Sequence, residues 1–301
     1  MAVFIDYIQY ICHKYKRSKM NSKNVFLTFL AAGVIFFTTA YIYKHHIPCE
    51  TITPHVAAVS FDLDLDQLVA AMTVIGERVP QLSKLSSETV SDCGRMRALF
   101  KRTLVYSPDL HIDFIMRTHQ DPLGEFVYAK YAHSFGLVRT ALLRERYDAV
   151  CMEGSIFDGF GSDVRYKEVQ ARAECVGAKF DPTNIDKANA ELDGWLELEN
   201  RGIRFKAGED VCLDMIMSEV ISGNLSIQGP ARERLIDIVQ RLRSAYVVAK
   251  LIDDLRTSKG HTGAVVFGYL HDKDFRDIAS RLGLKARILD TSDEGILSAK
   301  G

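Results

Sequence analysis

The chain lacks an excess of charge of either sign. Its 301 residues include 38 Lys and Arg against 39 Asp and Glu, which gives a formal net charge of -1 at pH 7. Proteins that bind DNA or RNA through the phosphate backbone carry a basic excess, so we exclude nucleic acid as a partner. The hydrophobic content of 47% excludes a disordered polymer. Length and composition together allow one large globular domain with a smaller appendage.

Common metal and nucleotide signatures are also missing. The six cysteines form neither a CxxC pair nor a zinc-ribbon spacing. Residues 154–162 (GSIFDGFGS) are rich in glycine, but they have neither the spacing of a dinucleotide fingerprint nor that of a P-loop. We interpret this segment as a flexible loop at the rim of a site.

One long run without charge stands near the amino terminus. Residues 25–43 (VFLTFLAAGVIFFTTAYIY) are nineteen uncharged residues. A helix of this length crosses a hydrocarbon core of about 30 Å, because it rises about 1.5 Å per residue. A cleaved signal peptide has a shorter apolar core and a small-residue cleavage site, which are not seen here. We therefore predict a transmembrane signal-anchor helix; the alternative is a buried core helix.

Basic residues set the predicted orientation of this helix. The lysines and arginine that precede it are Lys14, Lys16, Arg17, Lys19 and Lys23, and only Lys44 follows closely. The positive-inside rule then leaves residues 1–24 in the cytoplasm. Residues 44–59 are predicted to be a linker, and residues 60–301 to form an extracytoplasmic domain, which in a bacterium would be periplasmic.

Short apolar runs alternate with helical patterns through this domain. Residues 60–107 have helical spacing, and further helices are predicted at 126–146, 231–257 and 273–282. Strands are predicted at 112–116, 148–153, 202–207, 264–270 and 285–289. This alternation predicts an α/β domain with a largely parallel or mixed central sheet flanked by helices, in addition to the N-terminal transmembrane helix.

Ionisable residues stand at or just past the carboxyl ends of four predicted strands. They are His119, Glu153, Glu209 and His271. Ligands of parallel α/β sheets bind beyond these ends, so the four side chains would converge on one crevice. Imidazole and carboxylate groups are suited to divalent metal binding or to acid–base chemistry. A structural alternative stays open, because strand-end histidines often cap helices and Glu209 and Asp210 precede a helix.

The order of these residues resembles a known family. The matching segments are Thr118-His119, Asp148-Ala-Val-Cys-Met-Glu153-Gly154, Arg243 on a predicted helix, and Val265-Val-Phe-Gly268-Tyr-Leu-His271. They are similar to the TraB/GumN and Tiki branch of the superfamily that also contains ChaN-type haem-binding proteins and erythromycin esterases. The similarity covers residues 110–290. In the first Gly-x-x-His motif, Met116 stands where the family has glycine.

The resemblance implies a membrane-anchored, metal-dependent hydrolase that cleaves peptide or ester bonds. In that family layout His119, Glu153 and His271 would bind a divalent ion (Mn, Co or Zn), with Glu209 as a further ligand or base. Arg243 would stabilise negative charge on a carbonyl oxygen. A second hypothesis is a protein that binds haem or another small ligand through His119 or His271. A third, favoured by Met116, is a non-catalytic envelope interaction module.

Four cysteines of the outer domain are candidates for disulfide bonds. Cys49, Cys93, Cys175 and Cys212 would face an oxidising compartment, whereas Cys12 would be cytoplasmic and Cys151 lies in a predicted buried strand. The alternative is that all of them are small buried hydrophobic residues, the usual role of scattered cysteines in a long chain. The sequence predicts no particular pairing.

Overall fold

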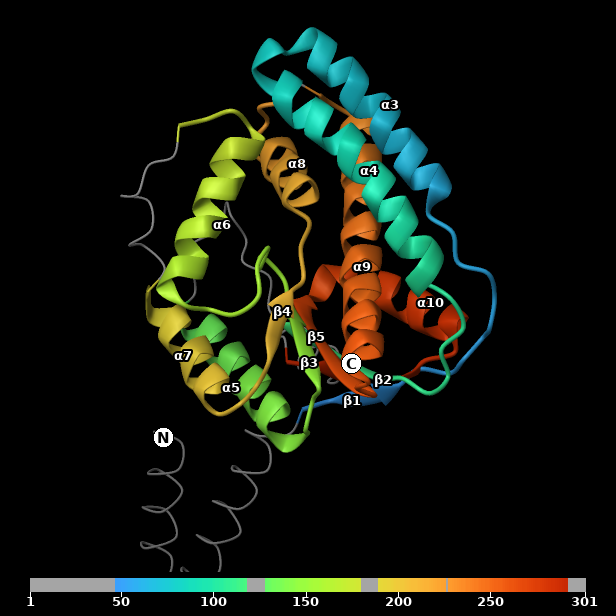
Figure 1. The fold of residues 1–301 in the computed structure, drawn as a ribbon, viewed down its shortest axis with the longest axis vertical. Helices are drawn as coiled ribbons and strands as arrows, with labels where there is room; N and C mark the ends of the chain where they lie inside the picture. The colour runs from blue at the N-terminus through green and yellow to red at the C-terminus, as the bar shows by residue number, and fades with distance from the viewer. Residues whose placement is uncertain (1–46, 118–127, 180–188, 226, 292–301) are drawn as a thin grey trace, which may run out of the picture. The chain divides into compact units, whose positions relative to one another are not determined.

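The computed structural model describes residues 47–117, 128–179, 189–225 and 227–291 (Figure 1). The predicted transmembrane span 25–43 and the predicted ligand His119 lie outside these ranges. Among the described residues, no helix combines the length and the apolar character needed to cross a membrane.

A six-stranded mixed sheet forms the centre of the domain. Its strands are β1 (Cys49–Thr51), β2 (His111–Arg117), β3 (Ala149–Met152), β4 (Phe205–Ala207), β5 (Thr262–Gly268) and β6 (Lys285–Asp290), in the order β1-β6-β2-β5-β3-β4. The edge strand β1 is antiparallel to β6, and all other neighbours are parallel. The predicted α/β class with a mixed sheet flanked by helices is thus confirmed.

Long helices cover one face of this sheet. They are α3 (Asp62–Arg78), α4 (Ser83–Thr103), α8 (Val211–Ile221), α9 (Pro230–Ser258) and α10 (Asp272–Leu282). The helices α9 and α10 contact the strands directly, and α3, α4 and α8 pack against α9 (Figure 1). At the centre of this layer, the ring of Phe114 on β2 stacks on that of Phe275 on α10, with centroids 4.7 Å apart.

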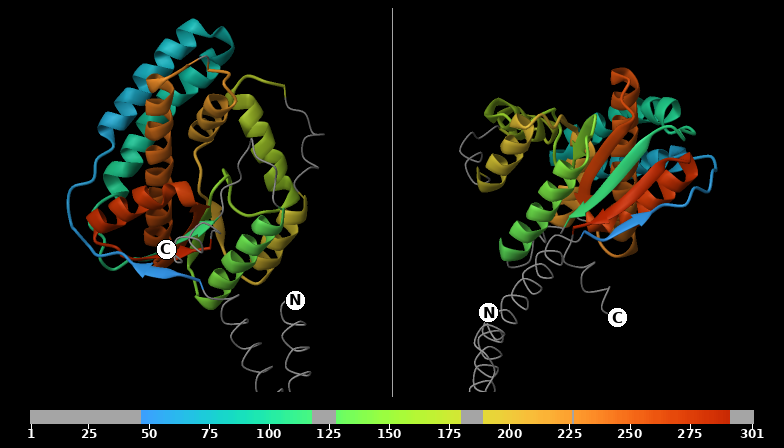
Figure 2. Two further views of the ribbon diagram at one scale, coloured as in Figure 1. Left: turned by 180° about the vertical axis from the view of Figure 1, so that it is seen from behind. Right: turned by 90° about the horizontal axis from the view of Figure 1, so that it is seen from below.

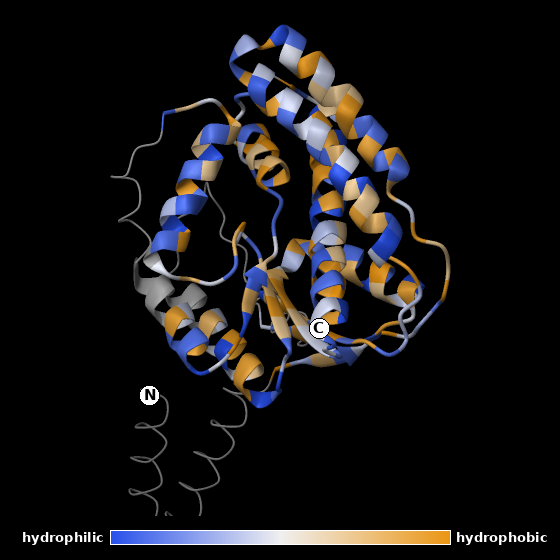
Figure 3. Cartoon of the chain, in the orientation of Figure 1, coloured by the Kyte–Doolittle hydropathy of each residue, from blue (hydrophilic) through white to orange (hydrophobic). Residues whose placement is uncertain are grey.

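The opposite face of the sheet has its own core. It is covered by α5 (Tyr128–Arg144) and α7 (Asn189–Asn200), which lie on the other side of the sheet from α10 (Figure 2). Leu142 of α5 and Trp195 of α7 pack there with Ile115 and Val266 of the sheet. Because both faces are covered, the central strands are largely apolar, as Figure 3 shows. The remaining long helix, α6 (Ser162–Cys175), contacts α8 and α4.

The observed strands differ from the predicted ones at three places. The strand β5 runs from Thr262 to Gly268, not over 264–270, because Tyr269 and Leu270 belong to a 3-10 helix. The strand β4 starts at Phe205, three residues later than expected, because the amides of Gly202 and Ile203 bond back to the last turn of α7. The strand β1 lies inside the stretch predicted as a linker. Its three residues are exposed, and only the flanking Ile47 and Ile52 are buried, so no alternating pattern marks it in the sequence.

The chain connections create a switch point between β2 and β5. From β2 the chain passes through α5 to β3, on the far side of β5, whereas from β5 it passes through α10 to β6, on the far side of β2. Ligands of α/β proteins bind beyond the carboxyl ends of two neighbouring strands whose connections run in opposite directions. Arg117 and Gly268, paired in register, border this position.

A buried carboxylate anchors the other end of β2. Asp113 is 0% exposed, and its oxygens accept hydrogen bonds from Arg287 at 2.8 and 2.6 Å and from the Tyr147 hydroxyl at 2.7 Å. The imidazole of His111 lies 2.9 Å from the same group. Burial and the nearby Asp113 charge raise the pKa of Tyr147, so its hydroxyl stays a donor. These contacts stabilise a charge that would be costly to bury alone.

We expect Asp113→Ala to lower the free energy of unfolding by about 2–3 kcal/mol, because it removes the acceptor of Arg287 and of the Tyr147 hydroxyl, while Arg287 keeps its contact with Glu145 at 3.1 Å. Asp253→Ala is the matched control, since the Asp253–Arg102 pair at 2.9 Å is largely exposed. Loss of the Asp253–Arg102 pair should lower the free energy of unfolding by at most about 1 kcal/mol. Urea unfolding of both variants measures the two values, and equal losses would contradict this account of the core.

Candidate functional site

Residues from five segments meet at the carboxyl ends of the strands. They are Arg117 at the end of β2, Glu153 after β3, Glu209 after β4, His271 at the end of the short 3-10 helix η3 (Tyr269–His271) after β5, and Arg243 with Ser244 in the middle of α9. Glu153, Glu209, Arg243 and His271, four of the five predicted site residues, are therefore neighbours. The fifth, His119, lies outside the described residues.

Arg243 and Glu209 form a buried ion pair at the centre of the group. The Arg243 Nε lies 3.2 and 3.1 Å from the two oxygens of Glu209, and Nη2 lies 2.5 Å from Oε1. The residues are 7% and 2% exposed. A guanidinium that contacts both oxygens of a carboxylate gives a strong, geometrically specific interaction. It fixes the position of Glu209 relative to α9.

Glu153 lies between two guanidinium groups. Its Oε1 accepts a hydrogen bond from Arg243 Nη2 at 3.3 Å, and Arg117 Nη2 lies 3.5 Å from Oε2. The backbone amide of Gly268 also donates to Oε2, at 2.7 Å. Every one of these contacts favours the ionised form of the carboxylate. Glu153 thereby connects the ends of β2, β3 and β5 with α9.

His271 is oriented through one ring nitrogen. Its Nδ1 lies 2.8 Å from Ser244 Oγ, which is also 3.0 Å from the Gln240 carbonyl oxygen and 3.2 Å from Asp274 Oδ2. The Ser244 hydroxyl has a single proton, and the Gln240 carbonyl accepts only, so donation to it leaves Oγ to accept from Nδ1–H. In the neutral ring Nε2 is then the basic nitrogen, and it lies 3.8 Å from Glu153 Oε1.

Three contributors to this site did not stand out in the sequence. Ser244 directly follows Arg243 on α9, is 0% exposed, and interrupts an otherwise apolar buried surface. Asp274 follows His271 by three residues and contacts the same Ser244 hydroxyl, while burial raises the pKa of its carboxyl. The third is Arg117, the last residue of β2, whose Nη2 lies 3.5 Å from Glu153 Oε2. The signal for Ser244 was a polar residue within an apolar helical stripe.

Gly208 brings Glu209 close to the end of β3. A Cβ atom built on Gly208 would lie 2.8 Å from the backbone C and N of Met152 and nearer still to its carbonyl oxygen. The amides of Gly208 and Glu209 both donate to Ser155 O, at 2.9 and 3.0 Å. Only glycine allows so close an approach of two backbones. The position of Glu209 therefore depends on this glycine.

A divalent ion fits poorly at the predicted ligands Glu153 and His271. Arg243 and Arg117 both lie within 3.5 Å of Glu153 oxygens. The positive charge of each guanidinium repels a divalent ion bound to the same carboxylate. Elsewhere in the described part, Asp92, Asp210 and Cys212 place one possible ligand atom each within 4.8 Å of the others. Asp92 already pairs with Arg95.

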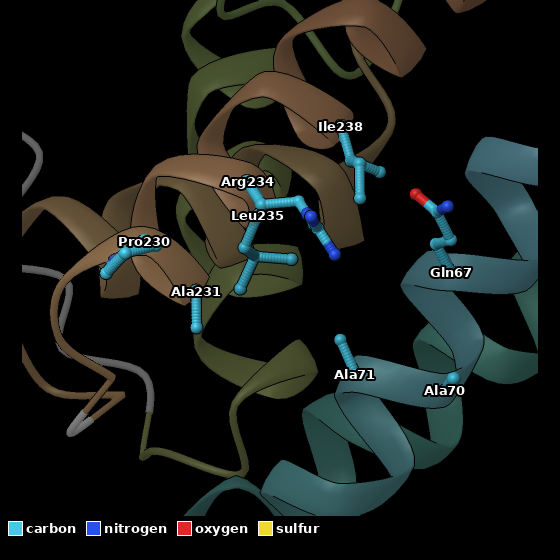
Figure 4. A pocket seen from close by; sticks show the side chains of 8 residues that line it. All are labelled: Gln67, Ala70, Ala71, Pro230, Ala231, Arg234, Leu235 and Ile238. Carbon is cyan, nitrogen blue, oxygen red and sulfur yellow. The ribbon is translucent and has the colours of Figure 1, made fainter.

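A separate groove lies between α3 and the first turns of α9. It has a volume of about 460 Å³ and is lined by Gln67, Ala70, Ala71, Pro230, Ala231, Arg234, Leu235 and Ile238 (Figure 4). The alanines of both helices leave this space because their side chains end at Cβ. None of the predicted site residues lines this groove.

No family model, curated protein or solved structure matches the chain. The resemblance to the TraB/GumN and Tiki branch therefore stays a prediction based on the sequence motifs, and so do the activity and the ligands that it implies.

We expect Gly208→Ala to destabilise the protein by about 2–4 kcal/mol, because the new methyl group overlaps the backbone of Met152. Gly94→Ala is the control. Gly94 lies within α4, and a Cβ added there meets nothing within 4 Å. That change should instead stabilise the helix by about 0.5–1 kcal/mol. Thermal and urea unfolding compare the two, and a neutral Gly208→Ala would contradict the close approach.

The free energy of unfolding should depend on pH through the carboxyl group of Glu209. Burial raises its pKa from 4.5 to about 7, against the opposing effect of Arg243. A raised folded-state pKa means that the stability contribution is complete below pH 4.5 and is lost as the pH rises through 7. The difference between these pKa values corresponds to about 3 kcal/mol.

Urea unfolding of the natural protein and of Glu209→Gln between pH 4.5 and 8 measures this effect; the range brackets the two pKa values. The natural protein should lose stability relative to the variant as the pH rises. Glu88→Gln, at an exposed glutamate on α4, is the control. A difference that does not change with pH would mean that Arg243 keeps Glu209 ionised throughout.

Proposed function

We propose that the chain is a hydrolase of peptide or ester bonds, anchored to a membrane through residues 25–43, whose reaction takes place at the crevice beyond β2 and β5. The observation that carries this proposal is the geometry of His271. Ser244 orients the imidazole through Nδ1, and Nε2 lies 3.8 Å from Glu153. An imidazole that is oriented through one ring nitrogen can transfer a proton at the other, which supports the role of a general base.

In this proposal Nε2 of His271 takes a proton from a water molecule, which attacks the carbonyl carbon of the substrate. The imidazolium that forms is stabilised by the charge of Glu153 across 3.8 Å. Ser244 acts as a positioning residue, because it bonds to the opposite ring nitrogen and does not reach the reacting atoms. The same imidazolium returns its proton to the leaving group.

The two arginines have different roles in this proposal. Arg243 is engaged by Glu209 and Glu153, and its side chain is 8% exposed, so it stabilises the two carboxylates. Arg117 has a side chain that is 20% exposed. It is therefore better placed to stabilise negative charge that develops on a carbonyl oxygen. The resemblance assigned that role to Arg243.

The other hypotheses have less support from this geometry. Haem ligation needs an imidazole that a large planar ligand reaches, whereas the proposed chemistry at His271, which is 1% exposed, needs only a water molecule at Nε2. The proposed chemistry includes no step at a metal, in keeping with the two guanidinium groups at Glu153. A divalent ion at His119, Glu153 and His271 stays a separate prediction of the family resemblance.

The proposal predicts hydrolysis that depends on His271. Full-length protein in mild detergent is assayed with p-nitrophenyl esters of increasing acyl length and with a quenched fluorescent peptide library. His271→Asn and Glu153→Gln should lower kcat by about 10²–10⁴-fold, the usual contribution of a general base. His261→Gln is the matched control, because His261 is exposed at the amino end of β5 and should leave the rate unchanged.

The Ser244→Ala variant distinguishes a role in orienting His271 from a role in the stability of the fold alone. It should lower kcat and move the acid limb of the pH profile, because the imidazole loses the partner of Nδ1. Metal content by mass spectrometry and a haem titration are run on the same samples. A stoichiometric ion lost in His271→Asn would favour the metal-dependent family mechanism, and a Soret band lost in that variant would favour haem. Equal rates for natural protein and His271→Asn would contradict the proposal.

A further inference from the structure

Two thiols face each other outside the crevice. Cys175 is the last residue of α6, and Cys212 is the second residue of α8. Their Sγ atoms lie 3.5 Å apart, and the residues are 6% and 1% exposed. The two cysteines are 37 residues apart in the sequence. Their contact therefore joins distant parts of the chain.

We propose that Cys175 and Cys212 form a disulfide bond that ties α6 to α8 and fixes the segment that carries Glu209. A disulfide has an S–S distance of about 2.05 Å, so each sulfur must move by less than about 1 Å, which a small side-chain rotation supplies. The proposal rests on geometry and, for the oxidising surroundings, on the proposed location of the domain outside the membrane.

Other contacts keep these two helix ends together. Arg172, one turn before Cys175, pairs with Asp214 on α8 at 2.8 Å and donates to the Gly154 carbonyl oxygen at 2.6 Å. Asp210 caps α8, because its side chain accepts from the amides of Cys212 and Leu213. The two backbones are thus positioned by polar contacts that do not involve sulfur. The bond would form in an arrangement that already exists.

A small-molecule disulfide can oxidise the two thiols in two successive exchange steps. The hydrogen bond from the Cys212 thiol lowers the pKa of the Cys175 thiol, so Cys175 is the attacking thiolate. It attacks one sulfur of the oxidant and releases one thiol. Cys212 then loses its proton, attacks the Cys175 sulfur of the mixed disulfide and releases the second thiol. The two protein thiol protons end on the two released thiols.

Cys93 provides a contrast within the same core. It is buried on α4, and burial raises the pKa of its thiol to about 11. Its thiolate fraction at neutral pH is therefore very small. The proposal assigns the bond to Cys175 and Cys212, because their sulfur atoms are in contact at 3.5 Å, and leaves Cys93 reduced.

The bond is tested on the full-length protein in mild detergent with oxidised glutathione as the probe. Free thiols are alkylated after oxidation, and the digest is analysed by mass spectrometry. We expect a linked peptide pair that contains Cys175 and Cys212, and a melting temperature roughly 5–10 °C higher than that of the reduced protein. Amide exchange at Cys212 and Leu213 should slow on oxidation, because Asp210 caps these amides.

Cysteine variants show whether the linked peptide and the temperature shift come from Cys175 and Cys212. Cys175→Ser/Cys212→Ser should abolish both the linked peptide and the temperature shift, whereas Cys93→Ser should retain both. Alkylation of Cys175 and Cys212 after oxidation, with no temperature shift, would overturn the proposal. A stoichiometric zinc ion lost in Cys175→Ser/Cys212→Ser would also overturn it and would favour a metal site with Asp92 and Asp210. None of these measurements depends on catalytic turnover. A negative result for the disulfide bond is therefore distinguishable from a negative result for the proposed hydrolase activity.

Discussion

The buried charge of Arg243 is the constraint on which the rest of the domain depends. It lies in the middle of α9, among residues of the apolar core. An ion that is removed from water costs several kcal/mol unless opposite charges meet it. Glu209 and Glu153 form hydrogen bonds and ion pairs with the Arg243 guanidinium, and they follow the ends of two different strands. The pairing therefore fixes how α9 lies relative to the carboxyl ends of β3 and β4.

This arrangement also determines what chemistry the crevice allows. Two arginines and two glutamates face one another here, and burial raises the pKa of Glu209 to about 7, so its charge changes near neutral pH. The Nδ1 atom of His271 is hydrogen-bonded to Ser244, which assigns proton transfer by this imidazole to Nε2, next to Glu153. A cluster that neutralises itself without a metal is suited to proton transfer. Arg117, whose side chain is 20% exposed, can meet negative charge on a substrate.

The sequence predicted those parts of the fold that local pattern determines. The strands β2 and β6 and the helices α9 and α10 appear within one or two residues of the expected bounds, because apolar runs, caps and a helix-ending Gly283 mark them. It also placed Glu153, Glu209 and His271 at strand ends. It did not predict β1, whose residues are all exposed, or the contact of Ser244 with His271, which joins residues 27 positions apart.

The segment that carries Glu209 is the part of the crevice with the least support from the sheet. The strand β4 has three residues and lies at the edge, so its ladder alone fixes the segment weakly. Gly208 against Met152, the Asp210 cap and the Arg172–Asp214 pair supply the missing constraints. A covalent bond at Cys212 would act on the same segment. The redox state of that thiol would then influence how firmly Glu209 engages Arg243.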